Sequence, residues 1–518
     1  MVLKNIQMYK IFKIFEALLN RVTMYRLVFR VLFSWFAIAL ILSSVQKLSF
    51  EPYALLYSFL VIFIVSFITQ KIFVSVFKVQ ANTESTYITA FILTFIISPP
   101  VAGQYYTILP VLIWVGIFGV AVKYILAISK KHIFNPVAIT VVITSFTIGG
   151  SASWWVGTAW MLPFVLVGGL LIVWKIRRFE LVLSFLSVAI LSIVVGSLGK
   201  TGLLTLAYQI FLDSPIIFFA TIMLTEPLTT PPTKIKRMLY GAFTGLIYAP
   251  YVHIGTMFST PELALGIGNI FSWLISPKRR YVLTLQSVKK IARDTGEFVF
   301  SSDHKVKFKP GQYMELTLAH RKADTRGSRR YFTIASSPTE NEIAFGIKFN
   351  PKKSSSFKTA LAEMEEGQFV FAGQVAGDFI LPKNKDQKLC FIAGGIGITP
   401  FRSMIAYMLD KNEQRDVVLV YSCKRIEELA YTHLIHRANT HLGLKAVSTL
   451  SDTLHIPDGW DGYKGFVEVD LIINEVPDYL ERMFYVSGPN SMVAAVQKIL
   501  LEIGVDKKNI KIDYFPGF

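Results

Sequence analysis

The chain has 518 residues, so we expect several domains. Of these residues 53% are hydrophobic, more than the roughly 45 to 50% typical of soluble domains, so we expect part of the chain to contact membrane lipid. The formal net charge is +18, but much of the Lys and Arg excess lies between apolar runs, which favours membrane topology over nucleic-acid binding. Two cysteines are too few for a disulfide framework or for a cysteine-ligated iron–sulfur cluster, which needs about four thiolates, and no metal site is predicted.

The apolar residues of the segment 1–30 are interrupted by basic ones. This segment is predicted to be a basic amphipathic segment that lies on the inner leaflet. Residues 31–275 are predicted to form a transmembrane domain, because their apolar runs can cross, or nearly cross, a hydrocarbon core of ~30 Å. About ten spans are expected from this length criterion. They lie near residues 31–48, 53–70, 87–99, 107–127, 136–149, 160–174, 181–198, 203–223, 238–251 and 261–275.

The connections between these runs alternate in charge. Lys71, Lys131 and Lys234 lie in basic connections of one set, whereas the other set has little beyond Lys47 and Lys200. Because basic connections face the cytoplasm, the pattern predicts a multi-pass protein of the inner (cytoplasmic) membrane with both termini in the cytoplasm.

Two segments on the predicted cytoplasmic side carry polar motifs, Lys131 to Pro136 and Met223 to Thr233. The second segment has two interpretations. It is either a proline-rich connection with turn hydrogen bonds or a site whose hydroxyls bind an anionic group, such as a flavin phosphate or a quinone head, with Glu226 as a polar anchor. The candidate binding residues are Thr225, Thr229, Thr230 and Thr233.

These two motifs resemble those of the flavin-carrying membrane subunits of Rnf electron-transport complexes and of the related sodium-pumping NADH:quinone oxidoreductases. The resemblance implies a flavin that passes electrons within the membrane, so FMN is a candidate cofactor of residues 31–275. The families attach FMN through a Ser-Gly-Ala-Thr-like stretch, for which Gly150 to Trp154 is a poor substitute. Any FMN is therefore predicted to be bound without a covalent link.

Residues 281–383 change to short alternating strands, a pattern typical of a small antiparallel β-barrel. The run Arg330-Tyr331-Phe332-Thr333 resembles the R-x-Y-[S/T] signature of ferredoxin-NADP(+) reductase-like flavoproteins. By that resemblance Arg330 binds the FAD pyrophosphate and Phe332 covers the isoalloxazine ring in place of the usual tyrosine. Thr333 would bond near flavin N5, which makes it a candidate catalytic residue.

A serine-rich segment after this motif resembles the family's second flavin loop. Ser355 and Ser356 precede a helical stretch, where hydroxyls and amides suit phosphate oxygens. A solvated turn is the alternative interpretation.

Residues 388–518 are predicted to form a Rossmann-like α/β domain that binds NAD(P)H. The apolar run Leu389 to Ala393 is typical of a buried parallel strand, and the glycines after it allow close approach to a cofactor. Thr399 is predicted to cap the next helix, with Pro400 at its first position. The candidate nucleotide-binding residues are Gly394, Gly395, Gly397, Thr399, Ser422, Lys424, Arg425, Gly488, Pro489 and Met492.

Three further features of this domain bear on the reaction. Lys424 and Arg425 follow the second strand, where they favour NADPH over NADH because they can bind the 2′-phosphate. Ser487 stands where the resemblance places a cysteine beside the nicotinamide, so it is a candidate catalytic residue. By the same resemblance, Phe518 or Phe515 is a candidate for the aromatic ring that shields the flavin, with an edge strand and a loose tail as the alternative.

The motifs predict a multi-domain protein with a polytopic α-helical membrane domain, an antiparallel β-barrel that binds FAD and the α/β domain. We expect an FAD-dependent NAD(P)H oxidoreductase that passes electrons to a membrane flavin, a quinone, or a carrier of the ferredoxin or flavodoxin type. Redox-driven translocation of Na⁺ or H⁺ is one alternative. A transmembrane haem (ferric) reductase is another, but residues 31–275 contain only His132 and His253, predicted on opposite sides of the membrane.

Overall fold

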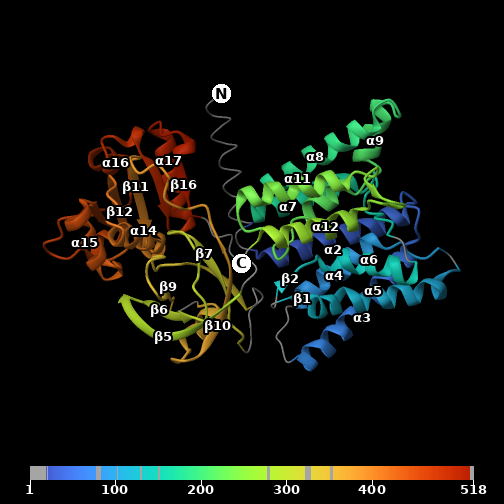
Figure 1. Ribbon diagram of the computed structural model, residues 1–518, viewed down its shortest axis with the longest axis horizontal. Coiled ribbons are helices and arrows are strands. Elements are labelled where there is room, and N and C mark those ends of the chain that lie inside the picture. The colour runs from blue at the N-terminus through green and yellow to red at the C-terminus, as the bar shows by residue number, and fades with distance from the viewer. Residues whose placement is uncertain are drawn as a thin grey trace. The chain divides into compact units, whose positions relative to one another are not determined.

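The computed structural model describes residues 19, 22–77, 83–101, 103–128, 131–149, 152–276, 280–320, 328–350 and 354–513. These residues form two compact units (Figure 1). The helical unit contains the described residues up to Ser276, and the sheet unit contains those from Arg280 onward. Most of the predicted amphipathic segment, residues 1–30, lies outside the described residues.

The helical unit consists of apolar helices whose starts are set by capping side chains. Thr23, Asn135 and Thr260 each accept a hydrogen bond from a backbone amide in the first turn of the helix that follows. The helices are α2 (Met24–Ser44), α3 (Pro52–Phe77), α4 (Thr83–Ile96), α5 (Tyr105–Ile125), α6 (Pro136–Ile148), α7 (Leu162–Ile176), α8 (Phe179–Ser197), α9 (Leu203–Phe211), α10 (Ile216–Phe218), the π-helix η1 (Phe219–Met223), α11 (Lys234–Tyr248) and α12 (Pro261–Ile275).

Among the described residues, four helices are long and apolar enough to cross a membrane, namely α2, α3, α5 and α8. A fifth span is possible if α9 and the segment Ile216–Met223, bent by 51°, count as one. The ten predicted runs each coincide with helical structure, but the predicted count of ten spans is not supported. Helices of 13 to 15 residues such as α6 and α7 reach only about 20 Å, short of a ~30 Å core. The apolar helices indicate membrane association.

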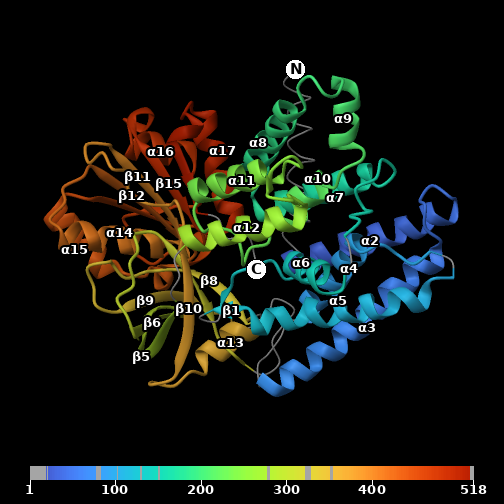
Figure 2. The same cartoon turned by 45° about the vertical axis from the view of Figure 1, so that its right-hand side comes forward.

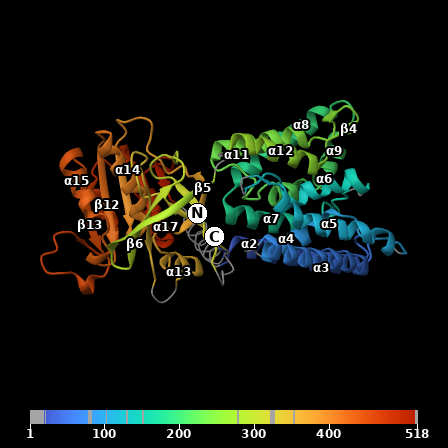
Figure 3. The ribbon, with the colours of Figure 1, turned by 60° about the horizontal axis from the view of Figure 1, so that its bottom comes forward.

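The order of elements in the helical unit repeats. The first half has α2 to α5, a hairpin of β1 (Ala127–Ile128) and β2 (Lys131–His132), and α6. The second half has α7 to α11, a hairpin of β3 (His253–Ile254) and β4 (Met257–Phe258), and α12. Helix α3 packs against α5 as α8 packs against α11, and α5 packs against α6 as α11 packs against α12 (Figure 3). The unit is therefore built from two halves of similar layout.

The sheet unit begins with a six-stranded antiparallel sheet that folds into the predicted barrel (Figure 2). Its strands follow the order β8-β7-β10-β5-β6-β9, and their inward side chains form one apolar core. The strands and the associated helix are β5 (Tyr281–Ala292), β6 (Thr295–Ser302), β7 (Tyr313–Thr317), β8 (Arg329–Thr333), β9 (Ile343–Lys348), β10 (Phe369–Ala376) and α13 (Ser356–Ala362).

A parallel sheet in the order β14-β13-β12-β11-β15-β16 follows, with helices on both faces (Figure 1). Alternate residues of its central strand divide between the faces, because Leu389 and Phe391 pack with α14 and α15 while Cys390 and Ile392 pack with α16 and α17. This confirms the predicted barrel and α/β architecture. The elements are β11 (Leu389–Gly394), η2 (Gly395–Ile398), α14 (Thr399–Asp410), β12 (Val417–Cys423), η3 (Ile426–Glu428), α15 (Thr432–Leu442), β13 (Lys445–Leu450), η4 (Thr453–His455), β14 (Tyr463–Lys464), α16 (Val469–Glu475), η5 (Tyr479–Glu481), β15 (Met483–Ser487), α17 (Asn490–Glu502), η6 (Lys507–Asn509) and β16 (Ile510–Ile512).

Candidate functional site

Strand β8 carries the predicted flavin motif and divides its side chains between two faces. Arg330 lies with its guanidinium carbon 5.5 Å from the ring centroid of Phe357, and the ring of Phe332 lies 5.8 Å from the same ring. On the other face, the Tyr331 hydroxyl donates to Glu315 at 2.9 Å. Burial, and then the Glu315 carboxylate, raise the pKa of Tyr331. The strand therefore presents Arg330 and Phe332 together, as its alternation predicts.

The other predicted flavin residues are buried or already hydrogen-bonded. Thr333, at the end of β8, is 7% exposed. Ser355 caps α13 by accepting from the Lys358 amide at 3.3 Å, and the Ser356 hydroxyl lies 3.0 Å from Nε2 of His320. Phosphate binding by the two serines stays a prediction, and His320 was not foreseen because its partner lies 36 residues away.

The glycine loop after β11 packs directly on the start of α17. A Cβ at Gly394 would lie 2.2 Å from Sδ of Met492 and 3.1 Å from Cδ of Pro489. Gly395 has a φ of +52°, a backbone conformation that glycine adopts without steric cost. The fold thus brings the first and last predicted nucleotide motifs into contact, although about 95 residues separate them in the sequence.

Gly397 makes the closest approach in this region. A Cβ there would lie 2.4 Å from the carbonyl oxygen of Ser487 and 2.6 Å from the amide nitrogen of Gly488. Strands β11 and β15 are hydrogen-bonded neighbours, so their carboxyl ends meet at one edge, where open α/β sheets bind ligands.

Thr399 does not cap α14, so this prediction is wrong. Thr399 is the first residue of the helix, and the residue before it, Ile398, is already helical at φ −67° and ψ −19°. The Thr399 hydroxyl donates to the Ile396 carbonyl at 3.1 Å. Because η2 runs directly into α14, no extended residue is left to act as a cap.

The sequence did not predict that the carboxylate of Asp513 would lie beside Ser487. The Ser487 hydroxyl donates to Oδ2 of Asp513 at 3.1 Å, and Asp513 is 9% exposed. Burial raises the pKa of Asp513 to about 7. Phe518, the predicted flavin shield, lies outside the described residues.

Of the two predicted cations after β12, Lys424 is exposed and Arg425 is paired with a carboxylate. Arg425 Nε lies 2.9 Å from Oδ2 of Asp452, and NH2 of Arg425 lies 3.4 Å from Nδ1 of His455. Ser422 is 9% exposed and pairs with Gly394 in the sheet register. A 2′-phosphate at Arg425 would therefore compete with the Asp452 carboxylate.

The helical unit contains a cavity of about 100 Å³ between its two halves. Three polar side chains contribute to its lining, namely Lys123 of α5, Asn135 at the start of α6, and Glu226 in the connection after η1. Among the other lining residues are Ile88, Ile92, Ile172, Ile176 and Ile222. This combination of apolar walls and a few polar groups is typical of small-molecule sites.

Lys123 and Asn135 are held in place by neighbouring helices. Lys123 Nζ donates to Thr89 Oγ1 at 2.8 Å and to Ser85 Oγ at 3.2 Å, both on α4. Asn135 Nδ2 donates to the Met223 carbonyl at 3.3 Å, and the Asn135 amide donates to Asn269 at 2.7 Å. The two Asn135 bonds connect the halves of the unit at the cavity, whereas the Lys123 bonds lie within the first half.

The predicted threonines are largely committed to the backbone. Thr225 lines the cavity, but its hydroxyl donates to the Thr221 carbonyl at 2.7 Å. Thr229 and Thr230 donate at 3.3 Å to the carbonyls of Glu226 and Pro227. Thr233 sits at the N-cap of α11 without a side-chain capping bond. This geometry favours the turn interpretation for Thr229 and Thr230.

Part of the sheet unit matches a known protein family. Residues 391–498 match the oxidoreductase NAD-binding domain family. The sheet unit is thus similar to oxidoreductases, with an NAD-binding domain that follows its β-barrel.

Relatives of this chain include several reductase components. A glycine betaine monooxygenase reductase subunit of Pseudomonas aeruginosa is 26% identical over 230 residues, which cover 44% of this chain and 62% of the relative. The F component of the Na⁺-translocating NADH-quinone reductase of Psychrobacter cryohalolentis is 29% identical over 208 residues, or 36% of this chain and 49% of the relative. A solved cytochrome P450 reductase from Amycolatopsis has a TM-score of 0.41 and 24% identity over 46% of this chain and 70% of that chain. The chain thus spans less than two thirds of the length of each of these two curated relatives.

We expect the buried Asp513 to make the stability of the sheet unit depend on pH. The pKa of Asp513 in the folded protein, about 7, exceeds the usual value of 3.8. Its contribution to the free energy of unfolding is therefore fully present below pH 3.8 and is lost as the pH rises through 7. Asp513→Asn, which can still accept from Ser487, is expected to be more stable than the wild type at pH 8.5, by on the order of 2 to 4 kcal/mol. The temperature of FAD release, measured at pH 5 and pH 8.5, checks this. An equal pH dependence in both proteins would contradict it.

Proposed function

We propose that this chain is a membrane-bound oxidoreductase that takes hydride from NAD(P)H onto FAD and passes the electrons to a ring bound in the helical unit. The contact of the Gly394 to Gly397 loop with Ser487 and Met492 carries the first half of this proposal. The cavity around Lys123 carries the second half. A diffusible carrier of the ferredoxin or flavodoxin type is the alternative electron acceptor.

The residues present suit FAD and the nicotinamide nucleotide. Arg330 and Phe332 share the face of β8 that lies against Phe357, so a cation and an aromatic ring would lie beside one ligand. FAD, when bound, accepts two electrons and can release them singly. Gly395 has open space where a Cβ would stand, so a pyrophosphate could approach the backbone of the loop closely at this residue. The buried Ser487 would contact the nicotinamide.

The size of the helical cavity favours a small ring as the second acceptor. Its volume of about 100 Å³ is close to the ~150 Å³ of an engineered cavity that binds benzene. A quinone head fits this description better than the three fused rings of a flavin. Lys123 would stabilise the negative charge that develops on a quinone oxygen as the ring is reduced.

Flavin analysis of the full chain in detergent tests this proposal. If the helical unit binds a quinone, we expect one FAD per chain, which acid precipitation releases, and no FMN. FAD together with FMN would assign a flavin to the helical unit instead. A chain without FAD would refute the proposed function.

The membrane topology is part of the proposal. We propose a multi-pass protein of the inner membrane with both termini in the cytoplasm, supported by the alternation of basic connections. The haem reductase alternative finds no support, because His132 and His253 lie in the hairpin strands β2 and β3 rather than inside helices. Nothing in the described geometry favours ion translocation.

NADPH preference is proposed from Lys424 and Arg425, and Asp452 opposes it. Asp452→Asn is expected to raise the ratio of kcat/KM for NADPH over NADH about tenfold, because it removes a negative charge beside the 2′-phosphate and frees Arg425. Steady-state kinetics with both nucleotides measures the ratio. Asp461→Asn removes an exposed charge from the same domain and should leave the ratio unchanged. An unchanged ratio in Asp452→Asn would place the 2′-position elsewhere.

A further inference from the structure

The first turns of α14 are bonded to the segment that follows the flavin strand. Arg402 NH1 donates to the Ala335 carbonyl at 3.1 Å, and the Ser403 hydroxyl donates to the Ser336 carbonyl at 2.6 Å. Arg402 also pairs with Glu340. Ser403 and Ser336 are fully buried, and the Arg402 side chain is 16% exposed. Two consecutive residues of one domain are therefore bonded to two consecutive carbonyls of the other.

The bonds of Arg402 and Ser403 to the carbonyls of Ala335 and Ser336 form a bridge between the two domains. Both ends of this bridge adjoin a cofactor motif. Helix α14 starts at Thr399, directly after the glycine loop, and Ala335 follows Thr333 of the flavin motif by two residues. The barrel also approaches the helix start from strand β9. A Cβ at Gly346 would lie 2.7 Å from Cγ2 of Thr399. The nicotinamide loop and the flavin strand are thus joined through few intervening atoms.

The positive charge of Arg402 lies next to carboxylates of the barrel. Besides Glu340, Glu297 on β6 lies 4.0 Å from Arg402 Nε, and the ring centroid of Tyr431 lies 5.7 Å from the guanidinium carbon. Two carboxylates from the barrel thus flank one cation from the nucleotide domain. A guanidinium suits this place because its planar fork can bond a carbonyl and a carboxylate at once.

We propose that Arg402 and Ser403 are positioning residues that hold the glycine loop in register with the flavin strand. They set the distance between the reacting atoms of the two cofactors and touch neither cofactor. The inference rests on the proposed hydride transfer from NAD(P)H to FAD. A displacement of about 1 Å between reacting groups can slow a reaction about 100-fold, so loss of the bridge would lower the rate of hydride transfer more than nucleotide affinity.

The experiment uses the full chain in detergent, mixed anaerobically with NADH or NADPH, and follows the flavin absorbance. In Arg402→Gln the limiting rate constant of flavin reduction should fall about 30-fold or more, with FAD content unchanged and the half-saturating nucleotide concentration within about threefold. Arg402→Lys should recover part of the rate. Ser403→Ala should lose about threefold to tenfold.

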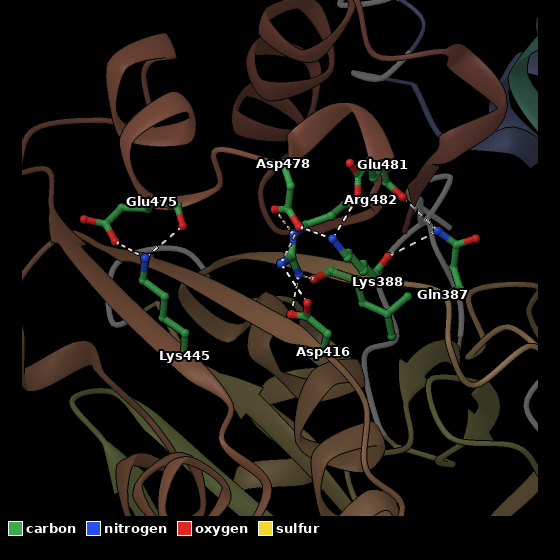
Figure 4. Close-up of polar contacts among 9 residues, drawn as sticks. Gln387, Lys388, Asp416, Lys445, Glu475, Asp478, Glu481 and Arg482 are labelled. Carbon is green, nitrogen blue, oxygen red and sulfur yellow. Dashed lines mark hydrogen bonds and ion pairs between the residues drawn. The ribbon is translucent and has the colours of Figure 1, made fainter.

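Arg482 offers a matched control. It is another buried arginine of the same domain, but it directly precedes β15, whereas the glycine loop follows the carboxyl end of β11. Figure 4 shows Arg482 with its partners Asp416 and Asp478. Arg482 NH1 donates to the Leu389 carbonyl at 3.0 Å and to Asp416 at 2.8 Å, and Arg482 Nε donates to Asp478 at 2.5 Å. Arg482→Gln should lower thermal stability but leave the limiting rate within about twofold.

Three results would overturn the proposal. They are a wild-type limiting rate in Arg402→Gln, an equal loss of rate in Arg482→Gln, or, if Arg402→Gln does not retain FAD, an unchanged rate in Ser403→Ala. Failure of the proposed function looks different, because the wild-type chain would then bind FAD without being reduced by either nucleotide.

Discussion

Gly397→Ala is expected to slow the reduction of bound FAD by NAD(P)H about 100-fold while FAD content stays unchanged. A methyl group at this position would meet the Ser487 carbonyl oxygen at 2.4 Å, closer than real Cβ atoms approach backbone. Either the start of α14 or the Ser487 segment must therefore move, and both belong to the proposed nicotinamide site. The flavin motif lies in the barrel, so FAD should remain bound. Anaerobic rapid mixing with each nucleotide measures the rate constant.

Gly373→Ala is the control for this substitution. Gly373 lies in barrel strand β10, and an added Cβ would have its nearest neighbour, Cγ of Arg280, at 3.5 Å, an ordinary contact. We expect wild-type reduction kinetics in Gly373→Ala. Wild-type kinetics in Gly397→Ala would instead show that the glycine loop does not adjoin the nicotinamide.

Lys123→Met should lower NAD(P)H-dependent quinone reduction at least tenfold and leave ferricyanide reduction unchanged. Methionine keeps the length of the side chain but removes the charge that faces the cavity, and with it the stabilisation of a developing anion, on the order of a few kcal/mol in a poorly polar site. Ferricyanide accepts electrons directly from exposed flavin and bypasses the cavity. A short-chain ubiquinone analogue and ferricyanide, assayed on the same preparation, give the two rates.

Lys71→Met provides the comparison for this variant. Lys71 lies on α3, is exposed, and has its ammonium 5.4 Å from the ring centroid of Phe67, so both activities should survive its loss. A parallel fall of quinone and ferricyanide activity in Lys123→Met would make Lys123 a structural residue. Unchanged quinone activity would remove the cavity from the electron path.

The sequence predicted the two cofactor motifs of the sheet unit because each motif is local. A strand, a glycine turn and a helix in order specify the Gly394 to Gly397 loop, and alternation along β8 specifies that Arg330 and Phe332 share a face. The Thr399 cap was predicted wrongly because local pattern does not reveal that a 3-10 turn merges with the helix. The roles assigned to the motif residues stay predictions.

Partners distant in the sequence were not predictable in this way. The Ser487 hydroxyl bonds to Asp513, 26 residues away, and Arg402 bonds to Ala335, 67 residues away. Their pairing depends on how strands and domains pack, which hydropathy and motif spacing do not encode. In the helical unit, hydropathy located the apolar runs but not their lengths. Lys123 and Glu226 come from different halves of the unit, so only the fold brings them to one cavity.

The duplicated layout of the helical unit has a consequence for biosynthesis. The extensively packed helix pairs, α3 with α5 and α8 with α11, each lie within one half, so each half can insert and pack as it leaves the ribosome. The cavity needs Lys123 from the first half and Glu226 from the second. The nascent chain therefore completes this cavity only after most of the helical unit has been made, and before the β-barrel of the sheet unit is synthesised.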